Sequence, residues 1–180
     1  MRKIIEYSLI SADGIVLDDP FLFADYHDGA YLRDRLSVFT ACEAILYGRT
    51  TYERFAKRYV SGIGATPPYV DRLNAIRKYV FSSTLERVEW SNSTIVRGDV
   101  AEEVTKLKQE EGGDLLVLGH GLLGEALLKR RLIDVLDVAI HPVLVGAGRP
   151  FLREHQSMTL KLTATKAFSK IVKLSYEPQY

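Results

Sequence analysis

Two glycine-containing segments have the composition of anion-binding turns. Gly48-Arg49-Thr50-Thr51 follows one short apolar run, and Gly119-His120-Gly121-Leu122 follows another. Both stand where a strand would lead into a helix, so glycine lets the backbone approach a ligand while the free N–H groups of the helix favour an anion. Arg49 adds a forked cation that matches a phosphate monoester. Two such turns favour a ligand with more than one phosphate group.

A third polar set, Ser82-Ser83-Thr84, follows another apolar run and adds hydroxyl groups at the same predicted edge. Taken singly, these motifs also fit structural roles, because an arginine at a helix start is commonly solvated and Ser-Ser-Thr commonly forms a turn. Gly119 to Gly124 spells G-x-G-x-x-G. In a Rossmann domain that fingerprint lies in an early βαβ unit, and an acidic residue follows about 20 positions later at a strand end. Here Asp137 falls inside a predicted strand, so we expect a dinucleotide-binding corner in a different fold.

The elements that must position these residues alternate between strand and helix, which is typical of an α/β domain. Four short, nearly all-apolar runs predict parallel strands covered on both faces. The last three runs are longer and alternate, which predicts an antiparallel C-terminal part with a hairpin near Ser169-Lys170. The predicted strands are Ile4–Ile10, Ala44–Tyr47, Tyr79–Ser82, Thr94–Val96, Leu115–Leu118, Val135–Val145, Leu160–Phe168 and Ile171–Tyr176.

Helical spacing and capping residues predict the intervening helices. A helix over Asp28–Phe39 and a short one over Thr51–Tyr59 follow from apolar spacing. Thr66-Pro67 predicts the start of a third, and Asp99 with Glu102 predicts a capped fourth that ends at Gly112-Gly113. The last predicted helix is Leu122–Arg130. Between them, residues 18–28 form the one long irregular segment, and such segments often cover sites.

The composition favours one soluble domain over residues 1–180. The 24 Lys and Arg residues balance 23 Asp and Glu, for a net charge of +1, and no run of like charge indicates a nucleic-acid or membrane partner. No apolar run reaches the ~18 residues of a spanning helix, and the N-terminus lacks a secretory-signal pattern. We therefore expect a cytoplasmic protein. Cys42 is the single cysteine, which excludes an internal disulfide and a thiolate cluster and predicts a buried side chain.

The ordered set of motifs resembles the dihydrofolate-reductase-like superfamily. It is most similar to stand-alone proteins related to the C-terminal reductase domain of the bifunctional riboflavin-biosynthesis deaminase-reductases. The segments that carry the resemblance extend over essentially the whole chain; they are Ser11–Gly14, Leu46–Glu53, Lys78–Leu85, Leu107-Lys108, Leu116–Gly121, Leu132–Leu136 and His141–Gly148.

The resemblance implies a three-layer fold with a mixed, mostly parallel sheet, a homodimer, and NADPH bound across the sheet. It places Arg49 and Thr50 at the 2′-phosphate, which favours NADP over NAD because a bare ribose offers Arg49 little to pair with. The remaining implied cofactor residues are Ser82 and Ser83 beside the 2′-phosphate, Gly48, Gly119, His120, Gly121 and Leu122 in the turns, and Arg97 beside the adenine.

Hydride transfer also needs an acceptor pocket and, usually, a proton donor. Asp13 and Asp28 are the catalytic candidates near the expected pocket mouth, with Asp25 as a third carboxylate. Asp13 equally fits a turn before Gly14, and Asp28 equally fits a helix N-cap. Stacking surfaces for the substrate are expected from Tyr7, Phe21, Phe23 and Tyr26, while His141 is expected to be a core or interface imidazole.

Several positions depart from the riboflavin reductase pattern. Tyr7 replaces a lysine, Leu118-Gly119-His120 replaces Glu-Gly-Gly, and Gly48–Phe55 does not reproduce the family's Gly-x-x-Thr-Val…Asp-x-Pro stretch. The zinc ligands of the deaminase half are absent. We expect His120 to crowd the turn, and the ribosylamino-pyrimidine to be a poor substrate.

The motifs and the family resemblance leave three functions to consider. The first is an NADPH-dependent reductase of a small heterocyclic or carbonyl substrate, related to 5-amino-6-(5-phosphoribosylamino)uracil reductase and dihydrofolate reductase. The second is an NADPH-binding or redox-sensing module without efficient turnover. The third, a purely structural oligomeric domain, is disfavoured by two anion-binding turns. For the homodimer, the apolar residues expected at the interface are Val135, Ile140, Val143, Leu160, Leu162 and Ile171.

Overall fold

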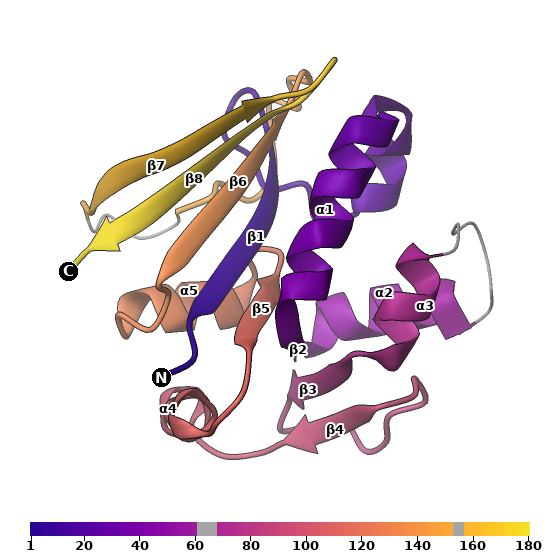
Figure 1. The fold of residues 1–180 in the computed structure, drawn as a ribbon, viewed down its shortest axis with the longest axis vertical. Coiled ribbons are helices and arrows are strands. Elements are labelled where there is room, and N and C mark those ends of the chain that lie inside the picture. The colour runs from indigo at the N-terminus through magenta and orange to yellow at the C-terminus, as the bar shows by residue number, and fades with distance from the viewer. Residues whose placement is uncertain (61–67, 153–156) are drawn as a thin grey trace.

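An eight-stranded sheet runs through the computed structural model, which describes residues 1–60, 68–152 and 157–180 (Figure 1). The strand order is β4-β3-β2-β5-β1-β6-β8-β7. The bounds are β1 Ile4–Ser11, β2 Cys42–Gly48, β3 Arg77–Phe81, β4 Ser93–Val96, β5 Asp114–Leu118, β6 Val135–His141, β7 Thr159–Ala167 and β8 Val172–Gln179.

The sheet is parallel from β4 to β6 and antiparallel at its C-terminal edge. Each neighbouring pair from β4 through β6 is parallel, whereas β8 runs antiparallel to both β6 and β7. The predicted hairpin closes where Phe168 N–H donates to the carbonyl of Ile171 at 2.8 Å. The mixed, mostly parallel sheet with antiparallel C-terminal strands is confirmed.

The largest difference from the predicted strand bounds is at β6. β6 ends at His141 rather than Val145, because Pro142 has no N–H to continue the ladder. It is also parallel to β1, from the pair Ile5 and Val135 onward, so only its β8 side is antiparallel.

Helices cover both faces of the sheet, as Figure 1 shows. α1 (Gly29–Ala41), α2 (Arg49–Val60) and α3 (Tyr69–Ala75) pack on one face, and α4 (Val100–Gln109) and α5 (Leu122–Lys129) pack on the other. Side chains that alternate along a strand pack in different cores on the two faces of the sheet. In β5, Leu116 and Leu118 pack in the first core, and Leu115 and Val117 pack in the second. The result is a three-layer domain.

Local capping chemistry fixes the helix starts. Asp28 accepts from Tyr31 N–H at 2.8 Å, and Asp99 accepts from the N–H groups of Ala101 and Glu102 at 2.9 and 3.0 Å. Both predicted caps are confirmed. The predicted cap at Thr66-Pro67 lies outside the described residues. The irregular segment contains a 3₁₀ helix, η1 (Pro20–Tyr26).

Cys42 is buried at the start of β2, as expected, and burial raises the pKa of its thiol to about 12. No helix in the described ranges is long and apolar enough to cross a membrane.

Candidate active site

The two glycine turns meet in one cleft of about 450 Å³ at the carboxyl ends of β2 and β5. These strands are neighbours, yet the helices that follow them pack on opposite faces, α2 against the first core and α5 against the second. Such a divergence opens a crevice beyond the strand ends, where open α/β sheets bind ligands. The cleft is lined by Asp18, Gly48, Arg49, Thr50, Thr51, Arg54, Phe81, Val100, Val117, Leu118, Gly119, Gly121, Leu122, Leu123 and Arg149.

The second turn leaves space for a ligand against the backbone. Gly119 has a φ of +75°, which glycine adopts without strain, and a Cβ at Gly119 or Gly121 would meet nothing within 4 Å. Gly121 precedes α5, and no side chain caps that helix start. The first N–H groups of α5 are therefore available to an anion.

Three arginines of the described residues line the cleft. Arg49 donates from Nε to Glu53 Oε1 at 2.8 Å and from Nη1 to Thr84 Oγ1 at 2.7 Å. Arg54 donates to the carbonyl of Asp18, and Arg149 donates to the carbonyl of His120 and pairs with the Asp18 carboxylate. Arg54 and Arg149 were not among the predicted site residues. Together the arginines give the cleft the charge that a phosphate-bearing ligand needs.

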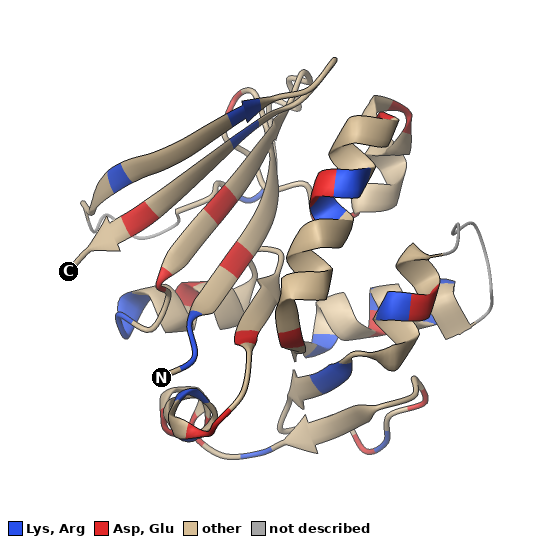
Figure 2. Ribbon diagram, in the orientation of Figure 1, with Lys and Arg blue, Asp and Glu red and all other residues tan. Residues whose placement is uncertain are grey.

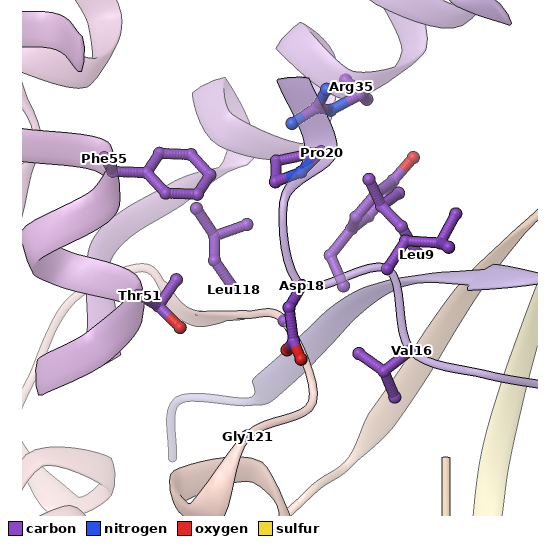
Figure 3. A pocket seen from close by; sticks show the side chains of 12 residues that line it. Leu9, Val16, Asp18, Pro20, Arg35, Thr51, Phe55, Leu118 and Gly121 are labelled. Atoms are coloured by element: carbon purple, nitrogen blue, oxygen red, sulfur yellow. The ribbon is translucent and has the colours of Figure 1, made fainter. Parts of the chain in front are cut away.

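A smaller cavity of about 40 Å³ adjoins the cleft (Figure 3). Both spaces are lined by Asp18, Thr51, Leu118, Gly119 and Gly121. The rest of the small cavity is mostly apolar, formed by Tyr7, Leu9, Val16, Leu17, Pro20, Arg35 and Phe55. An apolar chamber joined to a cationic cleft fits a ligand with a charged part and a neutral part.

A comparison with known families finds that the RibD C-terminal domain model matches residues 2–174. The chain belongs to the RibD C-terminal domain family. Among relatives, the uncharacterized protein YwjB of Bacillus subtilis is 26% identical over 97% of each chain. The uncharacterized YyaP of the same organism is 28% identical over 74% of this chain and 73% of its own.

Solved structures show the same fold. A Shewanella sp. PV-4 protein assigned to riboflavin biosynthesis superposes with a TM-score of 0.74 at 19% identity, over all of both chains. Acinetobacter baumannii RibD gives 0.68 at 14% identity over all of this chain and 59% of its own. Dihydrofolate reductase from Enterococcus faecalis, complexed with NADP(H), gives 0.64 at 15% identity over 99% and 97% of the chains. The dihydrofolate-reductase-like fold is confirmed, and the family supports a reductase-type function.

The glycine turn of this RibD C-terminal domain differs from its prediction in one respect. The side chain of His120 is fully buried beneath the turn, where Nδ1 lies 2.7 Å from Glu6 Oε1 and the ring stacks on Phe151 at 4.2 Å. The expected crowding by His120 is therefore wrong, because its side chain points into the second core. Only its backbone belongs to the turn.

Three expected cofactor residues build a neighbouring loop instead of lining the cleft. Ser82 Oγ accepts from the N–H groups of Thr84 and Leu85 at 3.3 and 3.0 Å. Arg97 donates to the carbonyls of Ser82 and Leu85 at 2.9 and 2.6 Å. Ser83 also lies outside the cleft lining. The loop still contributes indirectly, because its Thr84 hydroxyl holds Arg49.

The two predicted catalytic carboxylates have other partners. Asp13 accepts from Gly146 N–H at 2.8 Å, and Asp28 caps α1 while accepting from Ser169 N–H at 2.9 Å. Hydrogen bonds from Ser11 and Gly146 lower the pKa of Asp13, and those from Ser169 and Tyr31 lower the pKa of Asp28 to about 2. Both are ionised near neutral pH and lie outside the cavity linings, as does Asp25. The turn and N-cap alternatives hold, and the structure brings neither aspartate to the cleft or to the small cavity.

Of the four predicted stacking residues, Tyr7 alone lines the small cavity. Phe21 lies in a neighbouring groove of about 330 Å³ and packs on Phe55 at 5.3 Å. Phe23 and Tyr26 pack edge-on against His141, with centroids 6.0 and 6.4 Å away.

Asp18 is a site residue that the sequence prediction missed. Among the described residues lining either space it is the only carboxylate, and it faces both. In Figure 3 it points toward Gly121. Its position at the start of the irregular segment was the available signal, since that segment was expected to cover a site.

Proposed function

We propose that this protein is an NADPH-dependent reductase of a small heterocyclic or carbonyl substrate. The observation that carries the proposal is the shared wall between the cationic cleft and the apolar cavity, formed by Asp18, Thr51, Leu118, Gly119 and Gly121. A dinucleotide with phosphates in the cleft would reach that wall with its neutral end. Family membership and the likeness to an NADP(H)-complexed dihydrofolate reductase support the same function.

The residues present fit NADPH. Arg49 and Thr50 would hold the 2′-phosphate, and the open glycine turn with the uncapped start of α5 would hold the pyrophosphate. When bound, NADPH supplies a hydride. The chain's own contribution is to orient the cofactor and to exclude water with apolar walls such as Leu118 and Phe55.

Asp18 fixes the junction between the two spaces. Its carboxylate pairs with Arg149, and its carbonyl accepts from Arg54. These contacts hold the start of the irregular segment against the cleft. A carboxylate at this junction can accept hydrogen bonds from ribose hydroxyls or from a carboxamide.

The test is a titration of NADPH and NADH against wild type and Arg49→Ala. NADPH should bind wild type about tenfold to a hundredfold more tightly than NADH, because a charged hydrogen-bond pair is worth ~1.5–3 kcal/mol, and Arg49→Ala should remove most of this preference. Arg87→Ala removes an arginine that pairs with Glu89 outside the cleft and serves as the control. Equal affinities in wild type would contradict the proposal.

The alternative is an NADPH-binding or redox-sensing module without efficient turnover. Tyr7 and Leu118 line the cavity at positions where the riboflavin reductases carry a charged pair, and this observation favours the alternative. Steady NADPH oxidation with dihydrofolate, a flavin precursor or menadione supports the reductase. Tight NADPH binding with none of these reduced supports the module.

A further inference from the structure

Arg35 of α1 is a buried cation in the wall of the small cavity. Its side chain is only 7% exposed, and its Nη2 donates to Tyr69 Oη at 2.9 Å. Its guanidinium carbon lies 6.0, 5.9 and 5.4 Å from the ring centroids of Tyr7, Tyr31 and Tyr69. We call these three rings the tyrosine cage. The cage attracts the cation through its π-faces but gives it little hydrogen bonding.

Within the described residues, the cation has an unused donor and no counter-charge. Arg35 Nε is buried without a hydrogen-bond partner, and no described carboxylate forms an ion pair with Arg35. The adjacent Asp34 is directed elsewhere, accepting from Lys166 at 2.5 Å and from Lys173. Figure 2 shows acidic and basic residues next to each other in α1. Buried charges are normally paired, so an unpaired guanidinium in a cavity wall points to an anionic ligand.

The position of Arg35 indicates where that anion would lie. Arg35 lines both the small cavity and the 330 Å³ groove that contains Phe21 and Tyr59. In Figure 3 it stands beyond Pro20, on the side away from Gly121. The small cavity accommodates a compact oxyanion, and the groove offers aromatic surface for a ring attached to it. The anion would thus sit on the side of the acceptor that faces the phosphate cleft, and the ring would extend away from the cleft.

We propose that Arg35 binds an oxyanion, a carboxylate or an ionised ring oxygen, on a planar aromatic acceptor. The substrate class is therefore an aromatic anion rather than a neutral heterocycle. The inference rests on the proposed function, which makes this cavity the acceptor site. Within that site, Arg35 supplies a cation from α1 beside Tyr7, the position where the riboflavin reductases carry a lysine.

The test compares two probes of nearly equal size, naphthalene-2-carboxylate and naphthalene-2-carboxamide, by calorimetry with the full chain and saturating NADPH. Wild type should bind the carboxylate at least about tenfold more tightly, as a charge-assisted pair requires. Arg35→Met should abolish this preference. Arg35→Lys should keep part of it, because lysine retains the charge but cannot donate two parallel hydrogen bonds as a guanidinium does. Arg87→Met, at an exposed position, should leave it unchanged.

The outcomes separate this inference from the proposed function. Equal binding of the two probes to wild type, or an unchanged preference in Arg35→Met, overturns the role of Arg35. If thermal unfolding shows that Arg35→Met does not fold, the Arg35→Lys variant provides the test. An affinity of Arg35→Lys for the carboxylate equal to that of wild type would then contradict the role of Arg35. NADPH affinity, titrated without probe, should be the same in all variants. Absence of NADPH binding with an intact probe preference, measured without nucleotide, refutes the reductase proposal but not the anion site.

Discussion

Glu6 Oε1 lies 2.7 Å from His120 Nδ1, and both side chains are completely buried beneath the glycine turn of the cleft. Ser8 Oγ donates to the same carboxylate oxygen at 3.0 Å. A Cβ at Gly124 would lie 2.8 Å from Glu6 Oε2, so α5 packs directly on the pair. This buried pair connects the central strand β1 to the turn that faces the ligand.

Glu6→Ala should therefore affect both stability and binding. It leaves a buried imidazole nitrogen without its partner, which should lower the free energy of unfolding by about 1–3 kcal/mol. NADPH affinity should fall as well, because the turn loses its support. Urea unfolding and nucleotide titration measure the two effects. Glu177→Ala, which removes an exposed pair with Lys161 at 3.5 Å, should change each very little. Equal effects of the two substitutions would argue against a special role for Glu6.

Alanine in the glycine turn should separate ligand approach from backbone strain. Gly121 has φ −106°, which alanine tolerates, so Gly121→Ala should keep its stability yet weaken NADPH binding. Gly119→Ala should lose both stability and NADPH affinity, because a left-handed φ costs an alanine about 1–2 kcal/mol. Gly14→Ala is the matched control, with φ +79° and open space outside the cleft. The Gly14→Ala control should lose stability but keep its NADPH affinity, as measured by thermal unfolding and nucleotide titration. Undiminished NADPH binding by Gly121→Ala would contradict the proposed position of the cofactor.

Much of this fold could be predicted from the sequence because its signals are local. Apolar runs, glycine turns and the aspartate caps at Asp28 and Asp99 each act within a few residues. The strand end at His141 was missed although Pro142 signals it, because the apolar run continues past the proline.

The wall of the active site, in contrast, depends on distant pairs. Asp18 and Arg149 are 131 residues apart, and Glu6 and His120 are 114 apart. No local pattern predicts where such side chains point, so His120 was placed in the cleft. Arg35, which lies within a predicted helix, was overlooked for the same reason.

A contacting pair of histidines, His141 buried and His27 half-buried, should make the protein acid-sensitive. His27 and His141 have Nε2 atoms 3.2 Å apart, and burial lowers the pKa of His27 to about 3 and that of His141 to about 4. In the unfolded chain these two imidazoles take up protons near pH 6.5. The unfolded chain therefore binds more protons than the folded chain between pH 6.5 and about 4. Stability should therefore fall as the pH is lowered through this window. Urea midpoints from pH 7 to 4.5 measure this, and His27→Gln with His141→Gln should flatten the dependence. A wild-type midpoint that does not change would be contradictory.

We expect a homodimer in solution through the C-terminal sheet edge. β7 is the edge strand and is exposed along its whole length, including Leu160 and Leu162. An exposed edge with apolar side chains favours pairing with a second chain. Ile171, expected at the interface, is instead buried within the protomer. Light scattering at micromolar concentration should give twice 20.3 kDa, and Leu162→Glu should shift it toward monomer. A wild-type monomer would contradict the expectation.

The protein should reduce the phosphorylated ribosylamino-pyrimidine of the riboflavin pathway poorly. Where the riboflavin reductases carry a lysine and a glutamate, this cavity presents Tyr7 and Leu118. Burial raises the pKa of the Tyr7 phenol far above neutrality, so it cannot replace a charged group, and Arg35 is held in its cage on another element. Loss of acid–base groups commonly lowers turnover by ~10²–10⁴-fold. Acinetobacter baumannii RibD, assayed beside this protein with NADPH and the enzymatically generated pyrimidine, is the control. Turnover within about tenfold of that control would show that other side chains of this cavity perform the chemistry.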